Sequence, residues 1–175
     1  MVSIRGPVPI PVAEDARVAV SNLYDRHWVG LVRLAVLVTD DRQAAEDVVQ
    51  EAFMQLYQRW PLRESEAAVG YLRTTVLNRC RSVLRRRRVA RLYTPPHTAP
   101  GASAESAAVL GEERSQVQRA LQALPTRTRE VLVLRYYLDL PFEEIAQLLG
   151  IRTASARATA SRGLTALTDK LKELR

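Results

Sequence analysis

The sequence predicts an all-α protein made of two small helical domains joined by a flexible linker. Hydrophobic residues make up 47% of the 175 residues, which is enough for a sizeable core. They recur at three- and four-residue steps on both sides of one proline-rich stretch, without the strict alternation that marks strands. That stretch begins YTPPHTAPGASAES and has no hydrophobic period, so residues 93–110 are predicted to be the linker.

The chain is predicted to open with a disordered leader, residues 1–16, because prolines interrupt its apolar part. The first domain is expected to follow at 17–92. Its most apolar run, WVGLVRLAVLV at 28–38, contains Arg33 and is too short to span a bilayer. We therefore expect a buried core helix there, no membrane insertion, and a soluble cytoplasmic protein.

Residues 40–60 predict the best-formed helix of the first domain. Asp40 is the expected N-cap, with Gln43 three residues on in capping-box position. One apolar stripe is expected to face the core: Val49, Ala52, Phe53, Leu56, Tyr57 and Trp60. Asp47, Gln50 and Glu51 fall on another face, which by itself is typical of a solvated surface. Pro61 ends the helix, and 61–70 is expected to be a short connection.

The next helix, expected from Tyr71 to about Arg91, holds the charge anomaly of the chain. The stretch NRCRSVLRRRRVAR at 78–91 has seven arginines and no acid, which equals the formal net charge of +7. One stripe has four- and three-residue spacing: Thr74, Asn78, Arg81, Arg85 and Arg88. Leu72, Val76, Cys80 and Val83 lie roughly opposite. A disordered tail would not need this apolar stripe, so the pattern favours a helix that contacts phosphates, with Asn78 placed to read a base edge. A solvated face and a basic targeting signal of the nuclear type are the alternatives.

The second domain, residues 111–175, predicts four helices. The first carries Val117 to Leu124 and ends at Pro125, and the second spans 126–138 with Thr126 as its cap. The third, 141–150, has Pro141 as its first helical residue and Gly150 at its end. The fourth spans 153–174.

The last two helices predict a helix-turn-helix. Ala146 is small enough for the helices to approach, and Gly150 permits the sharp turn. The second helix would lie in the major groove of DNA and present Ser155, Arg157, Ala158, Thr159 and Arg162. Such helix pairs also occur in proteins that do not bind DNA, so the basic stripe upstream is needed to support this interpretation.

Catalytic and metal-binding functions are not predicted. The chain has one cysteine and two distant histidines, His27 and His97, and it lacks a glycine-rich phosphate loop. Cys80 lies on an apolar stripe and is expected to be a small core residue. We expect neither an enzyme nor a cofactor.

Three segments together resemble the extracytoplasmic-function (ECF) sigma factors of bacterial RNA polymerase, in the sigma-70 family. They begin YDRHWVGLVRLAVLVTDDRQAAEDVVQEAF, YLRTTVLNRCRSVLRRRR and LPTRTREVLVLRYYLDLPFEEIAQLLG. The resemblance covers roughly 20–92 and 112–170. It implies a sigma factor that binds core RNA polymerase and promoter DNA, with sigma domain 2 at 17–92 and sigma domain 4 at 111–175, and with anti-sigma proteins as partners.

The resemblance also implies where each partner binds. Core polymerase would bind Asp47, Val48, Gln50 and Glu51. Domain 2 would recognise and melt the minus-ten element with Trp60, Arg63, Tyr71, Thr74, Asn78, Arg81, Arg85 and Arg88. Domain 4 would read the minus-thirty-five element with Arg152, Thr153, Ser155, Arg157, Ala158, Thr159 and Arg162.

The fourth helix of the second domain departs from the family pattern. Ala156 and Ala160 stand where large aliphatic residues are usual, and Gly163 lies inside the helix at a cost of about 1 kcal/mol relative to Ala. We therefore expect this helix to pack loosely. Two other readings compete with a sigma factor: a helix-turn-helix regulator that binds duplex DNA alone, and an adaptor that binds only proteins.

Overall fold

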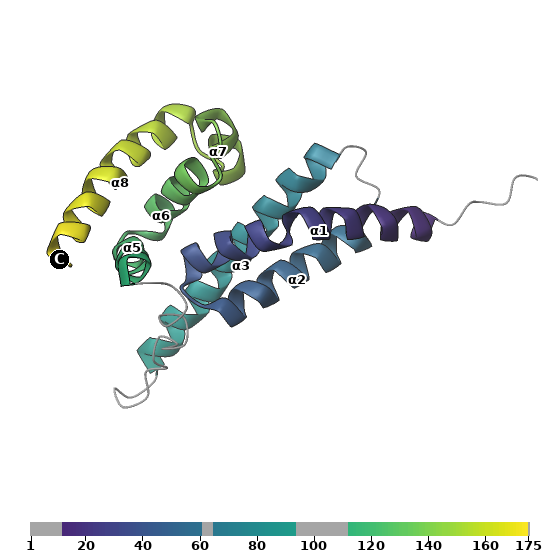
Figure 1. Cartoon of the computed structure of the whole chain (residues 1–175), viewed down its shortest axis with the longest axis horizontal. Coiled ribbons are helices and arrows are strands. Elements are labelled where there is room, and N and C mark those ends of the chain that lie inside the picture. Colours follow the sequence, from purple (N-terminus) through teal and green to yellow (C-terminus); the bar gives the residue numbers. More distant parts are fainter. Residues whose placement is uncertain (1–11, 61–64, 94–111, 175) are drawn as a thin grey trace, which may run out of the picture.

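The computed structural model describes residues 12–60, 65–93 and 112–174, and these parts of the chain are helical with short turns. Figure 1 shows the arrangement. The helices are α1 (Val12–Thr39), α2 (Arg42–Gln58), α3 (Ser65–Tyr93), α5 (Glu112–Gln122), α6 (Thr126–Leu132), the π-helical turn η1 (Val133–Tyr137), α7 (Phe142–Leu149) and α8 (Thr153–Glu173). The predicted all-α class is confirmed. The predicted linker lies outside the described residues except for Tyr93.

The N-terminal half, α1 to α3, is a three-helix bundle. α1 begins at Val12, so the helix reaches into the segment predicted as a leader. Leu34, Leu56 and Leu72, one from each helix, are fully buried at the centre of the bundle. Their burial fixes α2 and α3 against α1.

The turn between α1 and α2 corrects the predicted cap. Asp40 has a φ of 55° and donates its N–H to the carbonyl of Val36 at 2.8 Å, so it ends α1. Asp41 is the N-cap of α2, and its carboxylate accepts from the N–H of Ala44 at 2.8 Å. Asp tolerates the left-handed conformation better than most residues, which is why two consecutive Asp residues can divide the two roles.

α3 begins six residues earlier than predicted, at Ser65 rather than near Tyr71. Ala68 and Leu72 are buried, because the apolar stripe continues back into the segment that was expected to be a connection. The other end of α3 extends past α1 and α2 (Figure 1), where Leu92 and Tyr93 are 76% and 85% exposed.

The C-terminal half contains the predicted helices, with two local differences at their starts. Pro125 and Pro141 occupy the N-cap positions of α6 and α7, so Thr126 is the first helical residue and not a cap, and Pro141 precedes its helix. Gly150 ends α7 with a φ of 63°, as predicted for this position. α6 continues directly into η1, which together form the single helix expected over 126–138.

α8 packs closely, and this corrects the expectation of loose packing. Ala156, Ala160 and Gly163 are buried against the other helices of this half. A Cβ at Gly163 would lie 2.5 Å from Cγ2 of Thr128 and 3.3 Å from Cδ1 of Leu132, both on α6. The small residues therefore allow α8 to approach α6 closely. Large side chains would be needed to fill the space if the two helices were further apart.

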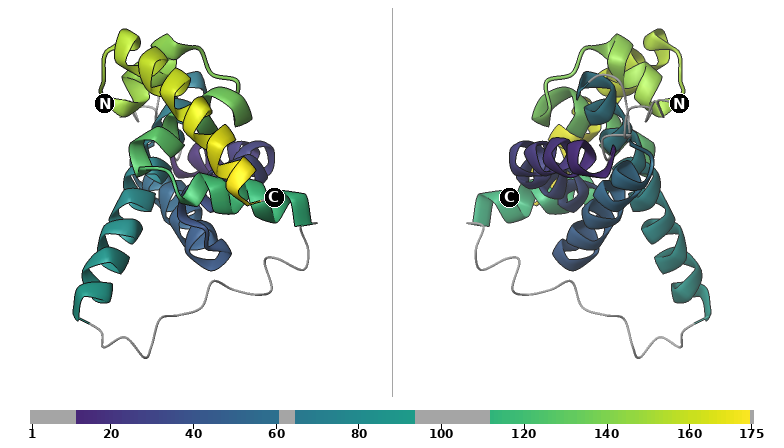
Figure 2. Two further views of the ribbon diagram at one scale, coloured as in Figure 1. Left: turned by 90° about the vertical axis from the view of Figure 1, so that its left-hand side faces the viewer. Right: turned by 90° about the vertical axis from the view of Figure 1, so that its right-hand side faces the viewer.

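The two halves lie against each other and share one hydrophobic core (Figure 2). α5 and α6 contact α1, and α7 contacts α3. The end of α1 is held most directly, because α5 side chains donate to its terminal carbonyls: Gln118 to Val36 at 3.1 Å and Gln122 to Leu37 at 3.0 Å. Carbonyls in the last turn of a helix are short of partners within the helix, so the C-terminal half completes the end of α1, although the Val36 carbonyl also accepts the N–H of Asp40.

Candidate nucleic-acid and partner surfaces

The first candidate surface is the basic ridge of α3, which we define as Thr74, Asn78, Arg81, Arg85 and Arg88. Asn78, Arg85 and Arg88 are exposed, and Thr74 and Arg81 are half-buried. On the opposite face Leu72, Val76 and Cys80 are fully buried. α3 therefore has the core face and the basic face that the spacing predicts.

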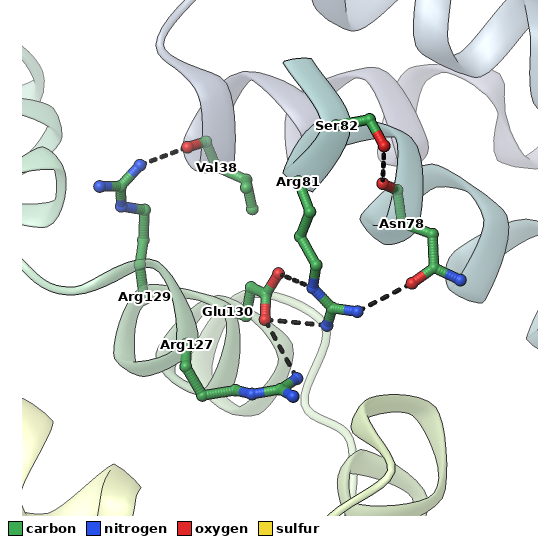
Figure 3. Close-up of polar contacts among 7 residues, drawn as sticks. All are labelled: Val38, Asn78, Arg81, Ser82, Arg127, Arg129 and Glu130. Atoms are coloured by element: carbon green, nitrogen blue, oxygen red, sulfur yellow. Dashed lines mark hydrogen bonds and ion pairs between the residues drawn. The ribbon is translucent and has the colours of Figure 1, made fainter. Parts of the chain in front are cut away.

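The N-terminal part of this ridge is turned toward α6 (Figure 3). Arg81 binds Glu130 through two hydrogen bonds, from Nε to Oε1 at 2.6 Å and from Nη2 to Oε2 at 2.9 Å. Its remaining Nη1 donates to Oδ1 of Asn78 at 2.8 Å. Glu130 is 1% exposed and also pairs with Arg127 at 3.4 Å. All three terminal nitrogens of Arg81 are thus used within the protein.

Other arginines of the charged stretch are paired within the N-terminal half. Arg79 pairs with Glu51 on α2, and Arg87 pairs with Asp41 and donates to the carbonyl of Thr39 at 3.0 Å. Arg87 belongs to neither predicted stripe, and its contacts show that it ties α3 to the α1–α2 turn. Four other arginines of the stretch are exposed: Arg85, Arg86, Arg88 and Arg91.

The predicted residues on α2 do not all share one surface. Asp47, Gln50 and Glu51 are exposed, whereas Val48 is 4% exposed and lies in the core. Val48 therefore supports the helix from inside, as a member of the buried core cluster. Tyr57, which was predicted on the core-facing stripe, is 44% exposed.

An apolar hollow of about 330 Å³ lies beside this acidic face. Tyr24, Phe53, Met54 and Tyr57 contribute to its lining, and Met54 is 55% exposed. Tyr24 stacks on Trp28, with ring centroids 4.6 Å apart. The sequence analysis missed this surface, although the three-residue spacing of Met54 and Tyr57 on one side of α2 is a signal that could have found it.

Three further residues were predicted to contact the minus-ten element, and the structure describes two of them. Trp60 and Tyr71 are half-buried and pack against the core. Arg63 lies outside the described residues. One predicted member of the minus-ten set is therefore unplaced.

The helix-turn-helix is formed by α7 and α8. Ile151 donates its N–H to the carbonyl of Ala146 at 3.0 Å, which closes the turn around Gly150. The predicted reading residues all have side chains at the surface or half-buried: Arg152, Thr153, Ser155, Arg157, Ala158, Thr159 and Arg162. Arg157 pairs with Glu143 at 2.9 Å, and its guanidinium lies 5.7 Å from the centre of the Phe142 ring. The N–H of Glu143 and the Arg157 side chain hold the pKa of the Glu143 carboxyl below its usual value.

The cysteine on the core face of α3 is a buried titratable group. Cys80 is buried, and burial followed by the charge of Glu130 raises the pKa of its thiol to about 12. The thiol is therefore protonated and packed, as predicted for a core residue. Among residues 12–60, 65–93 and 112–174 no group of three potential metal ligands is found, and no helix there is long and apolar enough to cross a membrane.

Comparisons with known proteins match both halves to one family. Sigma-70 region 2 matches residues 23–89, and Sigma-70, region 4 matches residues 114–167. The RNA polymerase sigma factor CarQ of Myxococcus xanthus is 30% identical over 169 residues, covering 92% of this chain and 94% of that protein. The RNA polymerase sigma-E factor of Streptomyces avermitilis is 28% identical over 142 residues, covering 81% and 78%.

Two solved structures have the same fold. CnrH in complex with the cytosolic domain of CnrY has a TM-score of 0.65 and 25% identity, covering 93% of this chain and 96% of that one. The sigma factor RpoE in complex with the anti-sigma factor NepR, from Bartonella quintana, has a TM-score of 0.66 and 18% identity, covering 88% and 99%. Both are similar to the chain over α1 to α3 and α5 to α8 together, not over one half alone.

Proposed function

The chain belongs to the sigma-70 family, as an ECF-type sigma factor that directs RNA polymerase to promoters without itself being an enzyme, and we propose which of its surfaces bind each partner. The observation that carries the assignment is the pair of region matches on the two helical halves. A helix-turn-helix regulator acting alone, or an adaptor, would not account for the region 2 match over α1 to α3.

We propose the family's domain division for this chain. Sigma domain 2 comprises residues 17–92, extended back to Val12 because α1 begins there. Sigma domain 4 comprises 111–175, and 93–110 connects them. The matched regions, 23–89 and 114–167, lie inside these bounds.

The proposed minus-ten surface is the basic ridge of α3 with Trp60, Arg63 and Tyr71. Guanidinium groups bind phosphate oxygens in bidentate fashion, and the exposed Arg85 and Arg88 are placed for this. Asn78 has an amide that can pair with a base edge once Arg81 no longer occupies it. Each half-buried ring can stack on an unpaired base, which is worth roughly 1–3 kcal/mol.

The proposed minus-thirty-five surface is the exposed face of α8. A helix-turn-helix places its second helix in the major groove, with the N-terminal residues of that helix toward the bases. Ser155, Arg157 and Ala158 are exposed in the first two turns of α8, and Arg162 follows one turn later. Arg157 would exchange its pair with Glu143 for a DNA contact.

The proposed core-polymerase surface is the acidic face of α2, formed by Asp47, Gln50 and Glu51. Val48 is left out of this contact surface because its side chain is buried. An anti-sigma factor is a further proposed partner, since one similar solved structure is the sigma factor RpoE bound to the anti-sigma factor NepR, and the other is CnrH bound to the cytosolic domain of CnrY. A factor that works on RNA polymerase acts in the cytoplasm, which is where we place this chain.

Binding to core polymerase tests the proposal in an assay that needs no DNA. We expect the purified chain to bind core RNA polymerase. The Asp47→Lys variant should bind at least about tenfold more weakly, because its positive charge would face the positive charge of a polymerase surface that is complementary to an acidic helix. Asp169→Lys, an equal charge change at an exposed position of α8, is the control. Equal binding by the two variants would contradict the α2 surface.

A further inference from the structure

A second hollow lies where the two halves meet, and it shares no lining residue with the apolar hollow beside α2. We call it the inter-half cleft. Its wall comes from 23–27 of α1, 69–74 of α3 and 144–148 of α7, and its volume is about 770 Å³. Clefts that bind small molecules measure about 300–1,000 Å³ and often lie between domains. The inter-half cleft therefore has the size and the place of a small-molecule site.

The charged side chains of the cleft are mainly basic. Arg26 and His27 of α1 and Arg73 of α3 line it, together with one carboxylate, that of Glu144 on α7. Arg73 binds Glu144 at 2.6 Å, so this negative charge is already matched. Arg26 is exposed, and no ion pair in the described part of the chain involves it. The cleft is therefore left with positive charge that the protein itself does not neutralise.

The imidazole of His27 reports the sign of the charge in the cleft. Burial lowers its pKa from 6.5, and the charges of Arg73 and then of Arg26 lower it further. Nearby positive charge has this effect because it disfavours the protonated ring. Both guanidinium groups act on one imidazole, so the three groups converge on one region of the cleft. An anion placed there would meet all three.

Uncharged residues complete the wall of the cleft. Thr74 and Gln147 supply a hydroxyl and an amide, both of which can donate hydrogen bonds to an anion. The apolar part of the wall comes from Leu23, Val69 and Leu148. Guanidinium groups bind phosphate oxygens, and apolar side chains pack on the flat face of a base. The cleft therefore offers partners to both ends of a molecule that joins a phosphate to an apolar ring.

We propose that the inter-half cleft binds a small phosphate-bearing molecule of nucleotide size. Arg26 and Arg73 bind the phosphate oxygens, with His27 beside them, and the apolar side chains contact the organic part. This site goes beyond the proposed function, because neither arginine belongs to a proposed promoter or polymerase surface. Thr74 is shared with the basic ridge of α3.

Calorimetric titration of the full chain tests the site, with ADP, inorganic pyrophosphate and adenosine as probes at constant ionic strength and without divalent cations. We expect one ADP to bind per chain, pyrophosphate to bind more weakly, and adenosine to show no binding at the same concentrations. Absence of binding by both ADP and pyrophosphate would overturn the proposal.

The variant Arg26→Gln tests the unpaired cation. It should weaken ADP binding about tenfold, because one charge-assisted contact to phosphate is lost. Arg33→Gln is the matched control, since Arg33 is also exposed on α1 but does not line the cleft. Equal affinities of the two variants would mean that the anion binds elsewhere on this basic chain, and would overturn the site.

Gly70 allows a steric test that removes no charge. It lies on α3 in the wall of the cleft, and a Cβ there meets nothing within 4 Å. Gly70→Leu should therefore fill part of the cleft without a clash and abolish ADP binding, and leucine has the higher helix propensity. Gly30→Leu is the control, because a Cβ at Gly30 is equally unhindered and Gly30 does not line the cleft. Unchanged ADP binding by G70L would contradict the proposal.

The variant Glu144→Gln separates a ligand site from a purely structural contact. It removes the carboxylate that lines the cleft and frees Arg73 for the phosphate, so ADP should bind roughly threefold more tightly. If the pair with Arg73 served only to hold α7 against α3, its loss would bring no gain in affinity. Unchanged or weaker binding by E144Q would therefore count against the site.

Proton NMR of His27 locates the bound anion. The chain has two histidines, and His27→Gln assigns their resonances. Saturating ADP should raise the pKa of His27 toward 6.5, because a neighbouring anion favours the protonated ring. ADP binding that leaves the pKa of His27 unchanged would place the anion outside the cleft and overturn the proposal. Circular dichroism checks the fold of each variant, and R26Q, which breaks no ion pair, keeps the test decisive if G70L is unstable.

Discussion

Replacing Gly163 by alanine tests the packing of the reading helix. In an open helix this change stabilises by about 1 kcal/mol, because alanine has the higher helix propensity. At Gly163 the new Cβ would lie 2.5 Å from Cγ2 of Thr128 and 3.3 Å from Leu132. Thr128 is β-branched and on a helix, so its side chain has little freedom to move away. Overpacking of this kind costs about 1–3 kcal/mol.

The overpacking cost less the gain in helix propensity leaves G163A destabilised by up to about 2 kcal/mol, which lowers the melting temperature by up to about 8 °C in a chain of this size. Gly30 is the matched control, since a Cβ there meets nothing within 4 Å, and G30A should be stabilised by up to about 1 kcal/mol. Thermal and urea unfolding followed by circular dichroism measure both changes.

The contact with Thr128 makes the reasoning specific. Thr128→Ser removes the Cγ2 methyl group and keeps the hydroxyl. Adding G163A to the T128S variant should therefore cost much less stability than adding G163A to the unmodified chain. The close approach of α6 and α8 would be refuted if G163A were stabilised as G30A is. Absence of coupling between positions 128 and 163 would refute it equally.

Three other predictions concern a buried thiol, a histidine and a pair of exposed arginines. The Cys80 thiol, with its pKa raised to about 12 by burial and by Glu130, should react with a thiol reagent at mildly alkaline pH only after unfolding, and fast labelling of the native chain would contradict its burial. The pKa of His27 is lowered from 6.5 by burial, then by Arg73 and Arg26, so the folded chain binds this proton more weakly than the unfolded chain. The free energy of unfolding should therefore keep its highest value above about pH 6.5 and decrease below that pH. In urea titrations between about pH 7.5 and pH 5.5, His27→Gln should show a smaller decrease. Replacing Arg85 and Arg88 by alanine should lower the slope of log affinity against log salt by about 2 in promoter binding by the holoenzyme; an unchanged slope would show that these side chains do not meet phosphates.

Local signals in the sequence were sufficient for most of the helices. The stripe from Val49 to Leu56 is buried as its spacing predicts, and Gly150 has the positive φ that its position at a helix end requires. Boundaries were less accurate where two residues could play the same part. Asp40 and Asp41 are both good caps, and only the actual end of α1 decides between them.

Long-range contacts were beyond the sequence. Arg81 and Glu130 are 49 positions apart, and neither residue carries a local sign of the other. The same holds for Gly163, whose absence of a side chain was interpreted as weak packing because the helix that it touches was not known. Val48 adjoins acidic positions in the sequence, but a helix turns by 100° per residue, which carries its side chain to the core.

Run-off transcription tests the central claim most directly. Core RNA polymerase would be assayed on a template with a mapped promoter of this factor, with and without the chain, and with an Arg157→Ala, Arg162→Ala double variant of α8. We expect a discrete transcript that requires the chain, starts downstream of that promoter and is strongly reduced by the α8 variant. A transcript independent of the chain, or no transcript from any promoter to which the chain and polymerase bind together, would contradict the account.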